Sequence, residues 1–258
     1  MSGREPRVAE RKLQEFLDRA EIDAAVFALR PDYRAMLVAV DGLHSAPSDD
    51  AGDNELLREA ETAAREALGD RPPEELPHVA AWRQAYRSFG AKPQRTRNSL
   101  ESLLRRAGTG LPRINRLTDT YNAISVLHRV PVGGEDLDRY VGPPRLVRAG
   151  GEEPFDTVAD GAPAVEHPDP GEVVWRDEAG VTCRRWNWRQ ARRTQLGEET
   201  TAALFVLDAL DPMTTAELEA AAEDLVGRLT GLAPDAQVAR RLIGAEPTLE
   251  QGDLNADP

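Results

Sequence analysis

The segment GLPRINRLTDTYNAISVLHRVPVGGEDLDRYVGPPRLVRAG, residues 110–150, decides the fold class because its periodicity changes half-way along. Its first half places apolar side chains three or four positions apart, which predicts a helix over 113–129. These side chains are Ile114, Leu117, Tyr121, Ile124 and Leu127. Its second half holds short runs bounded by Gly and Pro, which is typical of strands and turns. The chain is therefore predicted to mix helices with strands.

The flanking sequence shows both kinds of pattern. Helical spacing predicts helices at 7–20, 55–69, 78–90, 100–108 and 214–232, with N-caps at Asn54, at Asn98 or Ser99, and at Thr214 or Thr215. Short apolar or alternating runs predict strands at 24–29, 35–43, 139–142, 144–150, 171–180, 181–189 and 202–210. Asp-Glu-Ala-Gly at 177–180 predicts a hairpin turn. Because strands that follow each other through short turns are antiparallel, the predicted fold class is α+β.

Composition excludes several classes of protein. The 258 residues carry a net charge of −13, with 40% hydrophobic and 30% charged residues, as in globular chains. No apolar run approaches the ~20 residues of a membrane span, and the N-terminus lacks the apolar core of a secretory signal. The single cysteine, Cys183, excludes an internal disulfide and a thiolate metal cage. We therefore expect a cytoplasmic protein with no metal, no cofactor and no membrane partner.

The charges are unevenly distributed. Residues 81–129 hold ten Lys and Arg against two acids, and residues 184–193 hold five Arg and no acid. These segments sum to +13, so the rest of the chain carries −26. A basic face on an acidic body predicts binding of a polyanion, and the alternative is an ordinary solvated face. Within this set, Lys92, Arg95 and Arg97 precede a predicted helix N-terminus, which suits contact with phosphates.

The stretch CRRWNWRQARRTQ, residues 183–195, combines cations with indoles. If it is a strand, alternation places Trp186 and Trp188 with Arg184 on one face, and Arg185 and Arg189 on the other. Indole faces can stack on bases, and Arg184, Arg185, Arg189 and Arg193 can bind phosphates. The alternative interpretation places both tryptophans in the core and pairs the arginines with the protein's own acids.

Common catalytic motifs are absent from the sequence. It holds no G-x-S-x-G, no P-loop, no H-E-x-x-H and no G-x-G-x-x-G, and its four histidines have no metal-ligand spacing. Cys183 would need a lowered pKa to act as a nucleophile, and a buried structural thiol is expected instead. The helix predicted at 113–129 is rich in polar residues that favour helices poorly, such as Asn115, Asp119, Asn122 and Ser125. These side chains either satisfy buried backbone or line a polar pocket.

Residues 110–150 resemble the B3/B4 domain of the phenylalanyl-tRNA synthetase beta subunit. The matching features are Arg113-Ile114-Asn115, Asp119, Asn122, Pro131, Asp136, Gly142 and Arg148. Residues 171–210 and 85–106 resemble the corresponding parts of stand-alone bacterial B3/B4 proteins. The resemblance extends over about 82–212, and it implies a B3/B4-like fold with a mixed or antiparallel sheet flanked by helices. We accordingly expect one domain over 1–244, with an N-terminal extension, 1–81, and a disordered acidic tail, 245–258.

The resemblance implies a function in editing of tRNA. In the synthetase, this domain hydrolyses the ester that links a wrong amino acid, tyrosine, to the tRNA acceptor end. A stand-alone copy is thus expected to bind an aminoacylated acceptor end, with no DNA partner, and to deacylate a misacylated tRNA. Asn115, Asp119 and Asn122 are the catalytic candidates, and Ser125, Gly133 and Gly134 are the further pocket candidates. The glycines would expose backbone N–H groups or admit the ribose closely.

This sequence departs from the synthetase at two positions. Gly133 stands where the bacterial synthetase has a pocket histidine, and Val206 lies near the position of the glutamate that recognises the tyrosine hydroxyl. Asp208 is an unaligned candidate to replace that glutamate. Specificity for tyrosine is therefore not implied. Two alternatives remain at this point: a non-catalytic module that binds RNA or a small molecule, and an interaction scaffold.

Overall fold

The computed structural model describes residues 8–48 and 52–244, and the expected acidic tail lies outside these residues. The α-helices are α1 (Val8–Asp18), α2 (Ala24–Phe27), α3 (Gly52–Leu68), α4 (Pro77–Ser88), α5 (Ser99–Arg106), α6 (Arg116–His128) and α7 (Thr215–Leu232). The strands are β1 (Glu21–Ile22), β2 (Arg34–Asp41), β3 (Val132–Asp136), β4 (Arg145–Arg148), β5 (Phe155–Ala159), β6 (Ala162–Glu166), β7 (Val173–Arg176), β8 (Val181–Arg184), β9 (Arg189–Gln190), β10 (Ala202–Ala209) and β11 (Gln237–Gly244). The predicted α+β class is confirmed.

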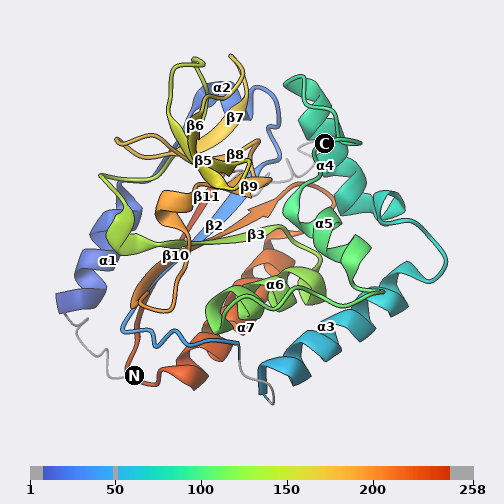
Figure 1. Cartoon of the computed structure of the whole chain (residues 1–258), viewed down its shortest axis with the longest axis vertical. Coiled ribbons are helices and arrows are strands. Elements are labelled where there is room, and N and C mark those ends of the chain that lie inside the picture. Colours follow the sequence, from blue (N-terminus) through green and yellow to red (C-terminus); the bar gives the residue numbers. More distant parts are fainter. Residues whose placement is uncertain (1–7, 49–51, 245–258) are drawn as a thin grey trace, which may run out of the picture.

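A four-stranded antiparallel sheet forms the centre, in the order β11-β2-β10-β3 (Figure 1). Side chains alternate between its two faces. Met36, Val38, Phe205 and Leu207 pack on one face with helices α6 and α7. The opposite face carries the alternate residues of the same strands and packs against the second sheet. Both faces of β2 and β10 are thus buried, which explains their nearly continuous apolar sequences.

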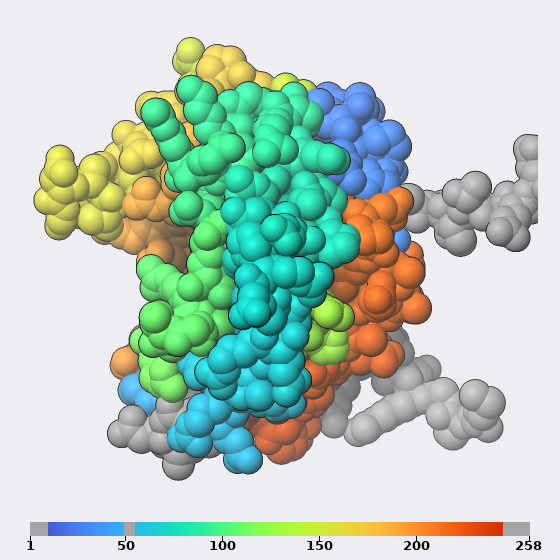
Figure 2. Space-filling view, turned by 90° about the vertical axis from the view of Figure 1, so that its right-hand side faces the viewer, coloured from blue at the N-terminus to red at the C-terminus, as the bar shows by residue number. Residues whose placement is uncertain are grey.

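The second sheet has five strands in the order β1-β4-β7-β8-β9. Its strands are antiparallel except for the short parallel pair of β1 with β4, so the sheet is mixed. A separate hairpin, β5–β6, lies beside it and belongs to the yellow segment that projects from the body in Figure 2. Helices α3, α4 and α5 form much of the face that Figure 2 shows, and their apolar sides make a core with α6.

Two predicted helix starts and one predicted turn are confirmed by the hydrogen bonds that hold them. Asn98 accepts a hydrogen bond from the amide of Glu101, and Thr214 forms a capping box with Glu217. The cap predicted at Asn54 is wrong, because α3 begins at Gly52. The hairpin turn at 177–180 is confirmed, since the Asp177 carboxylate accepts from the amides of Ala179 and Gly180.

Other predicted elements are wrong. Residues 24–27 form the short helix α2 and not a strand, because the Asp23 carboxylate caps the amide of Ala25. Residues 139–142 form a turn in which the amide of Val141 donates to Asp177. Strands β3, β5, β6 and β11 were not predicted. The sequence of β3, Val-Gly-Gly-Glu-Asp, has poor strand propensity, and its pairing with β10 overrides that preference.

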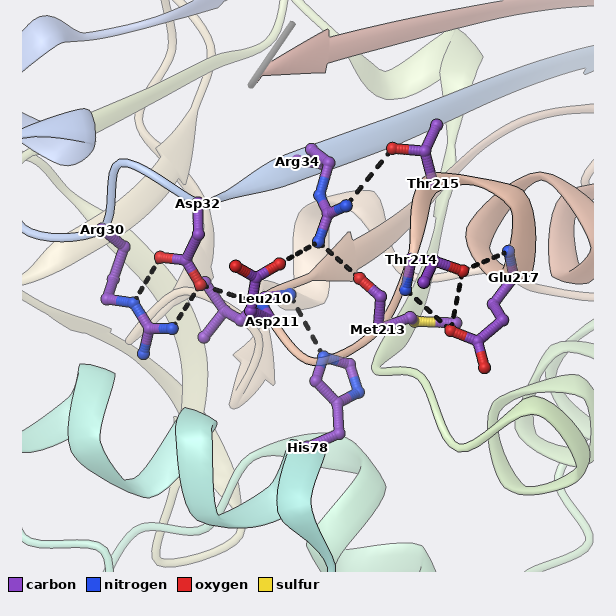
Figure 3. A network of polar contacts seen from close by, with 10 residues as sticks. All are labelled: Arg30, Asp32, Arg34, His78, Leu210, Asp211, Met213, Thr214, Thr215 and Glu217. Atoms are coloured by element: carbon purple, nitrogen blue, oxygen red, sulfur yellow. Dashed lines mark hydrogen bonds and ion pairs between the residues drawn. The ribbon is translucent and has the colours of Figure 1, made fainter. Parts of the chain in front are cut away.

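A polar network fastens the end of β10 to β2 and α4 (Figure 3). Arg34 on β2 donates to the Asp211 carboxylate at 3.0 Å and to the carbonyl of Met213, while Asp32 accepts from the amide of Asp211. His78 on α4 accepts from the amide of Leu210 at 3.1 Å. The network sets where β10 ends and where α7 begins. None of the helices in the described part of the chain is long and apolar enough to cross a membrane.

Candidate functional site

A cavity of about 290 Å³ opens where the two sheets meet helices α5 and α6. Its walls come from α5, the α5–α6 connection, α6, β3, the β7–β8–β9 sheet and β10. The lining residues are Ser99, Ser102, Leu103, Arg106, Pro112, Ile114, Thr118, Tyr121, Asn122, Val132, Gly133, Glu135, Trp175, Cys183, Trp186, Asn187, Trp188, Arg189, Gln190, Val206 and Asp208. Segments up to about 100 residues apart in the sequence thus build one hollow.

Two acids and two small or apolar residues on one sheet face line this cavity. Val206 pairs with Gly133, and Leu204 pairs with Glu135, so alternate residues of β3 and β10 project from the same face. Asp208 follows Val206 on that face. The result is a surface made by Gly133, Glu135, Val206 and Asp208, which we call the acid wall.

Both carboxyl groups of the acid wall are buried, with Asp208 2% and Glu135 3% exposed. The hydroxyl of Tyr33 donates to Asp208 at 2.5 Å, and the Asn187 amide donates to it at 3.3 Å. The hydroxyl of Tyr140 donates to Glu135. Burial raises the pKa of Glu135 and that of Asp208 to about 7 each, against the partial opposition of these hydrogen bonds. Either group can therefore take up or release a proton near neutral pH.

Helix α6 forms another wall. Thr118, Tyr121 and Asn122 stand three and four positions apart, so they lie on one face of the helix, and all three line the cavity. The amide of Asn122 has no hydrogen-bond partner among the described residues, although the residue is only 8% exposed. It is therefore available to a ligand.

The solvent end of the cavity is cationic and apolar. Arg106 on α5 is exposed, Arg189 on β9 is half-buried, and neither has a carboxylate partner in the described part of the chain. Arg189 donates to the carbonyl of Val158 at 3.2 Å, which ties it to the β5–β6 hairpin. Ile114 is 60% exposed beside them. The chemical character of the cavity therefore changes from its mouth inward, with guanidinium groups at the mouth, aromatic and aliphatic walls, and carboxyl groups inside. We call this arrangement the graded cavity.

Three of the predicted catalytic or pocket residues have structural roles instead. Asn115 caps α6 by accepting from the amide of Thr118 at 2.9 Å. Asp119 accepts from the amide of Ile114 and from the hydroxyl of Ser48 at 2.6 Å, and Ser125 donates to the carbonyl of Val130. All three are buried and none lines the cavity, so the prediction that they act on a substrate is corrected. Of the predicted residues Asn115, Asp119, Asn122 and Ser125, Asn122 is the one that lines the cavity.

The two glycines of β3 differ in position. Gly133 lines the cavity, and a Cβ atom there would lie 3.1 Å from the Gln190 amide, which crosses β3 to donate to the carbonyl of Gly134. At Gly134 a Cβ atom would come within 2.9 Å of Tyr121, Leu196 and Phe205 on the other face of the sheet. Gly134 therefore permits close packing of α6 on β3, and its prediction as a pocket residue is corrected.

Several arginines predicted to bind phosphate are neutralised by the protein's own acids. Arg184 is buried and forms a bidentate pair with Glu172 at 2.9 and 2.8 Å, and it also contacts Glu166. Arg193 pairs with Asp177 at 2.8 Å, and Arg97 lies 3.4 Å from Glu101. These arginines fasten strands, turns and helices together. The prediction that they contact phosphates is corrected for Arg184 and Arg193, which have their hydrogen bonds satisfied internally.

The predicted alternation fails after Arg184 because Arg185 and Trp186 have positive φ values of 47° and 68°. This left-handed turn sends the Trp186 ring into the core, where it is 0% exposed and lies 4.9 Å from Tyr33 and 5.4 Å from Trp82, centroid to centroid. Trp186 therefore lines the cavity from within the core, with no surface exposed to solvent. Trp188 remains half-buried in the cavity wall, with the Arg185 guanidinium 4.5 Å from its ring centroid.

A second hollow of about 360 Å³ lies beside the first and contains the predicted cations Lys92 and Arg95. Both side chains are exposed and have no carboxylate partner in the parts of the chain that are described. Arg185 lines this hollow, bonds to Thr96 and Glu172, and stacks on Trp188 of the first cavity. The two hollows therefore meet at the pair Arg185–Trp188.

Arg106 and Glu135 were missed as site residues in the sequence. The sequence contained an indication that Arg106 could bind a ligand, because it lies in the basic run that ends the predicted helix 100–108. The sequence contained no such indication for Glu135, since β3 was not recognised as a strand and its side-chain alternation could not be used. Asp208 was raised only as an unaligned substitute, and its place on the acid wall follows from the register of β10.

Other reactive groups are held in inert states. Burial raises the pKa of the Cys183 thiol well above its usual value, so it is not a nucleophile. The two ring nitrogens of His78 bond to the amide of Leu210 and the carbonyl of Arg129, and burial lowers its pKa, which fixes a neutral imidazole. Within residues 8–48 and 52–244, no three His, Cys, Asp or Glu side chains are placed to hold a metal ion.

The sequence profile of the B3/4 domain matches residues 81–223, which is more than half of the chain. The chain belongs to the B3/4 domain family. This span contains all of the cavity residues named above.

Comparison with solved structures gives a fold likeness to an N-terminal fragment of the phenylalanyl-tRNA synthetase beta-subunit from Pyrococcus horikoshii. The TM-score is 0.44 and the sequence identity is 10%, over 88% of this chain and 54% of that fragment. The chain thus spans about half the length of the fragment. A search of curated proteins gives no significant match.

Proposed function

We propose that this B3/4 protein binds the 3′ end of an aminoacylated tRNA and hydrolyses a misacylated ester. The observation that carries the proposal is the graded cavity. An aminoacyl-tRNA end has phosphates outside, a ribose and a base next, and an amino acid at its tip. Arg106 and Arg189 suit the phosphates, Ile114 and Trp188 suit the flat base, and the acid wall suits the ammonium group of the amino acid.

The chemistry requires little beyond orientation and a proton acceptor. A water oxygen attacks the ester carbonyl carbon, the bond from that carbon to the ribose oxygen breaks, and the water gives up a proton. Glu135 is the best acceptor in the cavity, since its carboxyl group lines the cavity and burial raises its pKa to about 7. It then returns the proton to the departing ribose oxygen. The products are the free amino acid and a tRNA with its terminal hydroxyl restored.

Asn122 is proposed to orient the ester, because its free amide can donate to the carbonyl oxygen on which negative charge develops. Gly133, beside Val206 on the acid wall, is proposed to lie next to the ribose, with the Gln190 side chain over it. Lys92 and Arg95, in the second hollow, are proposed to contact the phosphates that precede the terminal nucleotide. The proposal thus retains Asn122, Gly133, Lys92, Arg95, Arg185, Trp188 and Arg189 from the residues expected to act.

The test is loss of the amino acid from a panel of tRNAs, each charged with a different amino acid. We expect turnover on at least one mischarged member, and a fall of about 100-fold or more in that rate for Glu135→Gln, the usual effect of removing a general base. Glu178→Gln is the matched control, because Glu178 is exposed and lies outside the cavity. A rate that Glu135→Gln leaves unchanged would remove Glu135 from the mechanism.

The alternative is a module that binds RNA or a small molecule without catalysis. It is supported by Gly133, which occupies the position of the pocket histidine in the domain that the sequence resembles. Tight, salt-sensitive tRNA binding with no turnover on any charged tRNA favours this alternative. Failure to bind tRNA at low salt contradicts both the hydrolase and an RNA-binding module, and leaves a module that binds a small molecule.

A further inference from the structure

The buried acids among the described residues differ in their partners. Three of them pair with arginine. Glu101 pairs with Arg83, Arg97 and Arg105. Glu172 pairs with Arg184 and Arg185, and Asp177 pairs with Arg193. Asp208 and Glu135 are equally buried, yet neither forms an ion pair with any of the described residues. Both of them line the same cavity, whereas Asp136, which is also buried without an ion pair among the described residues, accepts hydrogen bonds from Thr200 and from the amide of Asp138 and lies outside it.

An unpaired carboxylate is costly to bury, and a cation brought by a ligand would remove that cost. The Asp208 carboxyl group has only neutral hydrogen-bond partners, Tyr33, Asn187 and Trp175, and carboxylate oxygens together can accept about four hydrogen bonds. The side chain of Asn122, which is only 8% exposed and has no hydrogen-bond partner among the described residues, lines the same cavity and can bond to a polar ligand there.

One ammonium group cannot neutralise both acids. Glu135 is opposite Leu204, and Asp208 is four residues further along β10, so their backbones lie about 13 Å apart at the rise of a strand. If Glu135 faces the ester and the α-ammonium group, Asp208 faces the far end of the amino acid. The wall between them is apolar or aromatic, with Val206, Trp175 and Cys183.

We propose that Asp208 makes the cavity selective for a basic amino acid, one with an aliphatic stem that ends in an ammonium or guanidinium group. The stem lies along Val206 and Trp175, and the terminal cation pairs with Asp208. This inference rests on the proposed function, and it names the class of amino acid that is removed.

The test uses adenosine analogues that carry an amino acid on the 3′ position through a stable amide bond. Lysyl and norleucyl analogues share the aliphatic stem and differ in the terminal cation. We expect calorimetry to show that the wild-type protein binds the lysyl analogue at least 10-fold more tightly than the norleucyl analogue. Equal affinities, or tighter binding of the norleucyl or a tyrosyl analogue, would overturn the proposal.

Asp208→Asn removes the charge and keeps the shape of the side chain, so it should reduce the lysyl preference to less than 3-fold. Asp138→Asn is the matched control, since Asp138 is exposed and lies outside the cavity. A preference that survives Asp208→Asn contradicts the role given to Asp208. If that variant fails to fold, the comparison of the two analogues on wild-type protein still decides the proposal.

The same experiments separate this inference from the proposed function. A lysyl preference in binding, without turnover on any charged tRNA, supports the cation site and contradicts hydrolysis. Turnover of tRNAs that carry neutral amino acids, without any preference for basic ones, supports hydrolysis and contradicts the cation site.

Discussion

The acids Glu172 and Asp208 are buried to the same extent, at 2% exposure each, but they are used differently. Glu172 precedes β7 and holds Arg184 of β8 through two hydrogen bonds, so it fastens parts of the protein to one another. Asp208 ends β10 with only neutral partners, and it faces a cavity. Burial alone therefore does not distinguish the two acids, and the role proposed for Asp208 rests on its neutral partners together with its place on the cavity wall.

The arginines divide in the same way. Arg184 and Arg193 complete internal pairs, whereas Arg106 and Arg189 stand at the mouth of the cavity without a carboxylate among the described residues. In a chain of net charge −13, acids are abundant, so cations that remain unpaired beside a cavity are informative. The structural charges and the charges available to a ligand can thus be tested separately.

The largest effect is expected where a structural pair is broken. Glu172→Gln leaves the buried guanidinium of Arg184 with the partly exposed Glu166 as its remaining acid, and should lower the free energy of unfolding by about 3 kcal/mol. Urea denaturation measures the change, and Glu178→Gln, at an exposed position, should change it by less than about 0.5 kcal/mol. Equal effects of the two variants would show that the pair does not hold the sheet.

A smaller effect is expected from the protonation of Asp208. Burial raises its pKa from 3.8 to about 7, so the folded state binds a proton that the unfolded state releases between these values. Stability from this group is complete below about pH 4 and is lost as the pH rises through 7. Between pH 8 and pH 5.5, wild type should gain about 2 kcal/mol relative to Asp208→Asn.

The groups in contact with Asp208 do not change their charge in the pH range of this measurement. Tyr33 and Cys183 face it, and burial raises the pKa of each above its already high usual value, so neither titrates between pH 5.5 and pH 8. Asn187 and Trp175, its other contacts, carry no charge. Urea denaturation of both proteins at the two pH values gives the result. A difference that does not vary with pH would show that the buried carboxyl is already ionised or already paired.

The smallest effect is expected at the mouth of the cavity. Arg106→Ala and Arg189→Ala should each weaken tRNA binding by about 1 kcal/mol, and should each reduce the slope of log affinity against log salt by roughly 0.7. Neither should alter stability appreciably. Arg240→Ala is the control, because Arg240 is exposed on β11, at the opposite edge of the central sheet from β3. A salt slope that all three variants leave equal would place the RNA elsewhere.

The predictions that succeeded rest on local signals. Apolar spacing predicted α6, and the side chains of Asn98 and Thr214 gave the start of α5 and α7 because capping is a contact within one turn. The predictions that failed involve contacts between distant segments. Strand β3 has two glycines and two acids, and only its pairing with β10 makes it a strand. The left-handed turn at Arg185 and Trp186, which no residue preference signals, moved one tryptophan into the core and left the other at the cavity.

In the site too, local sequence signals were recognised, and contacts between distant segments were not. The polar helix 113–129 was recognised as unusual, but its residues have different uses because a helix turns 100° per residue and presents only one face to the cavity. Asn122 lies on that face, whereas Asn115 and Asp119 satisfy backbone amides. The basic segments were likewise recognised, although the sequence could not indicate which arginines have acids within reach.

The sequence by itself determined the α+β class, the position of most helices, the uneven distribution of charge and the resemblance to the B3/4 family, because these depend on composition and on neighbours along the chain. The tertiary structure alone decided which acids and arginines are paired, since a partner such as Glu172 for Arg184 or Asp177 for Arg193 is set by strand register and turns. It also brought Glu135 and Asp208 to one wall, because pairing of β3 with β10 fixes which side chains share a face.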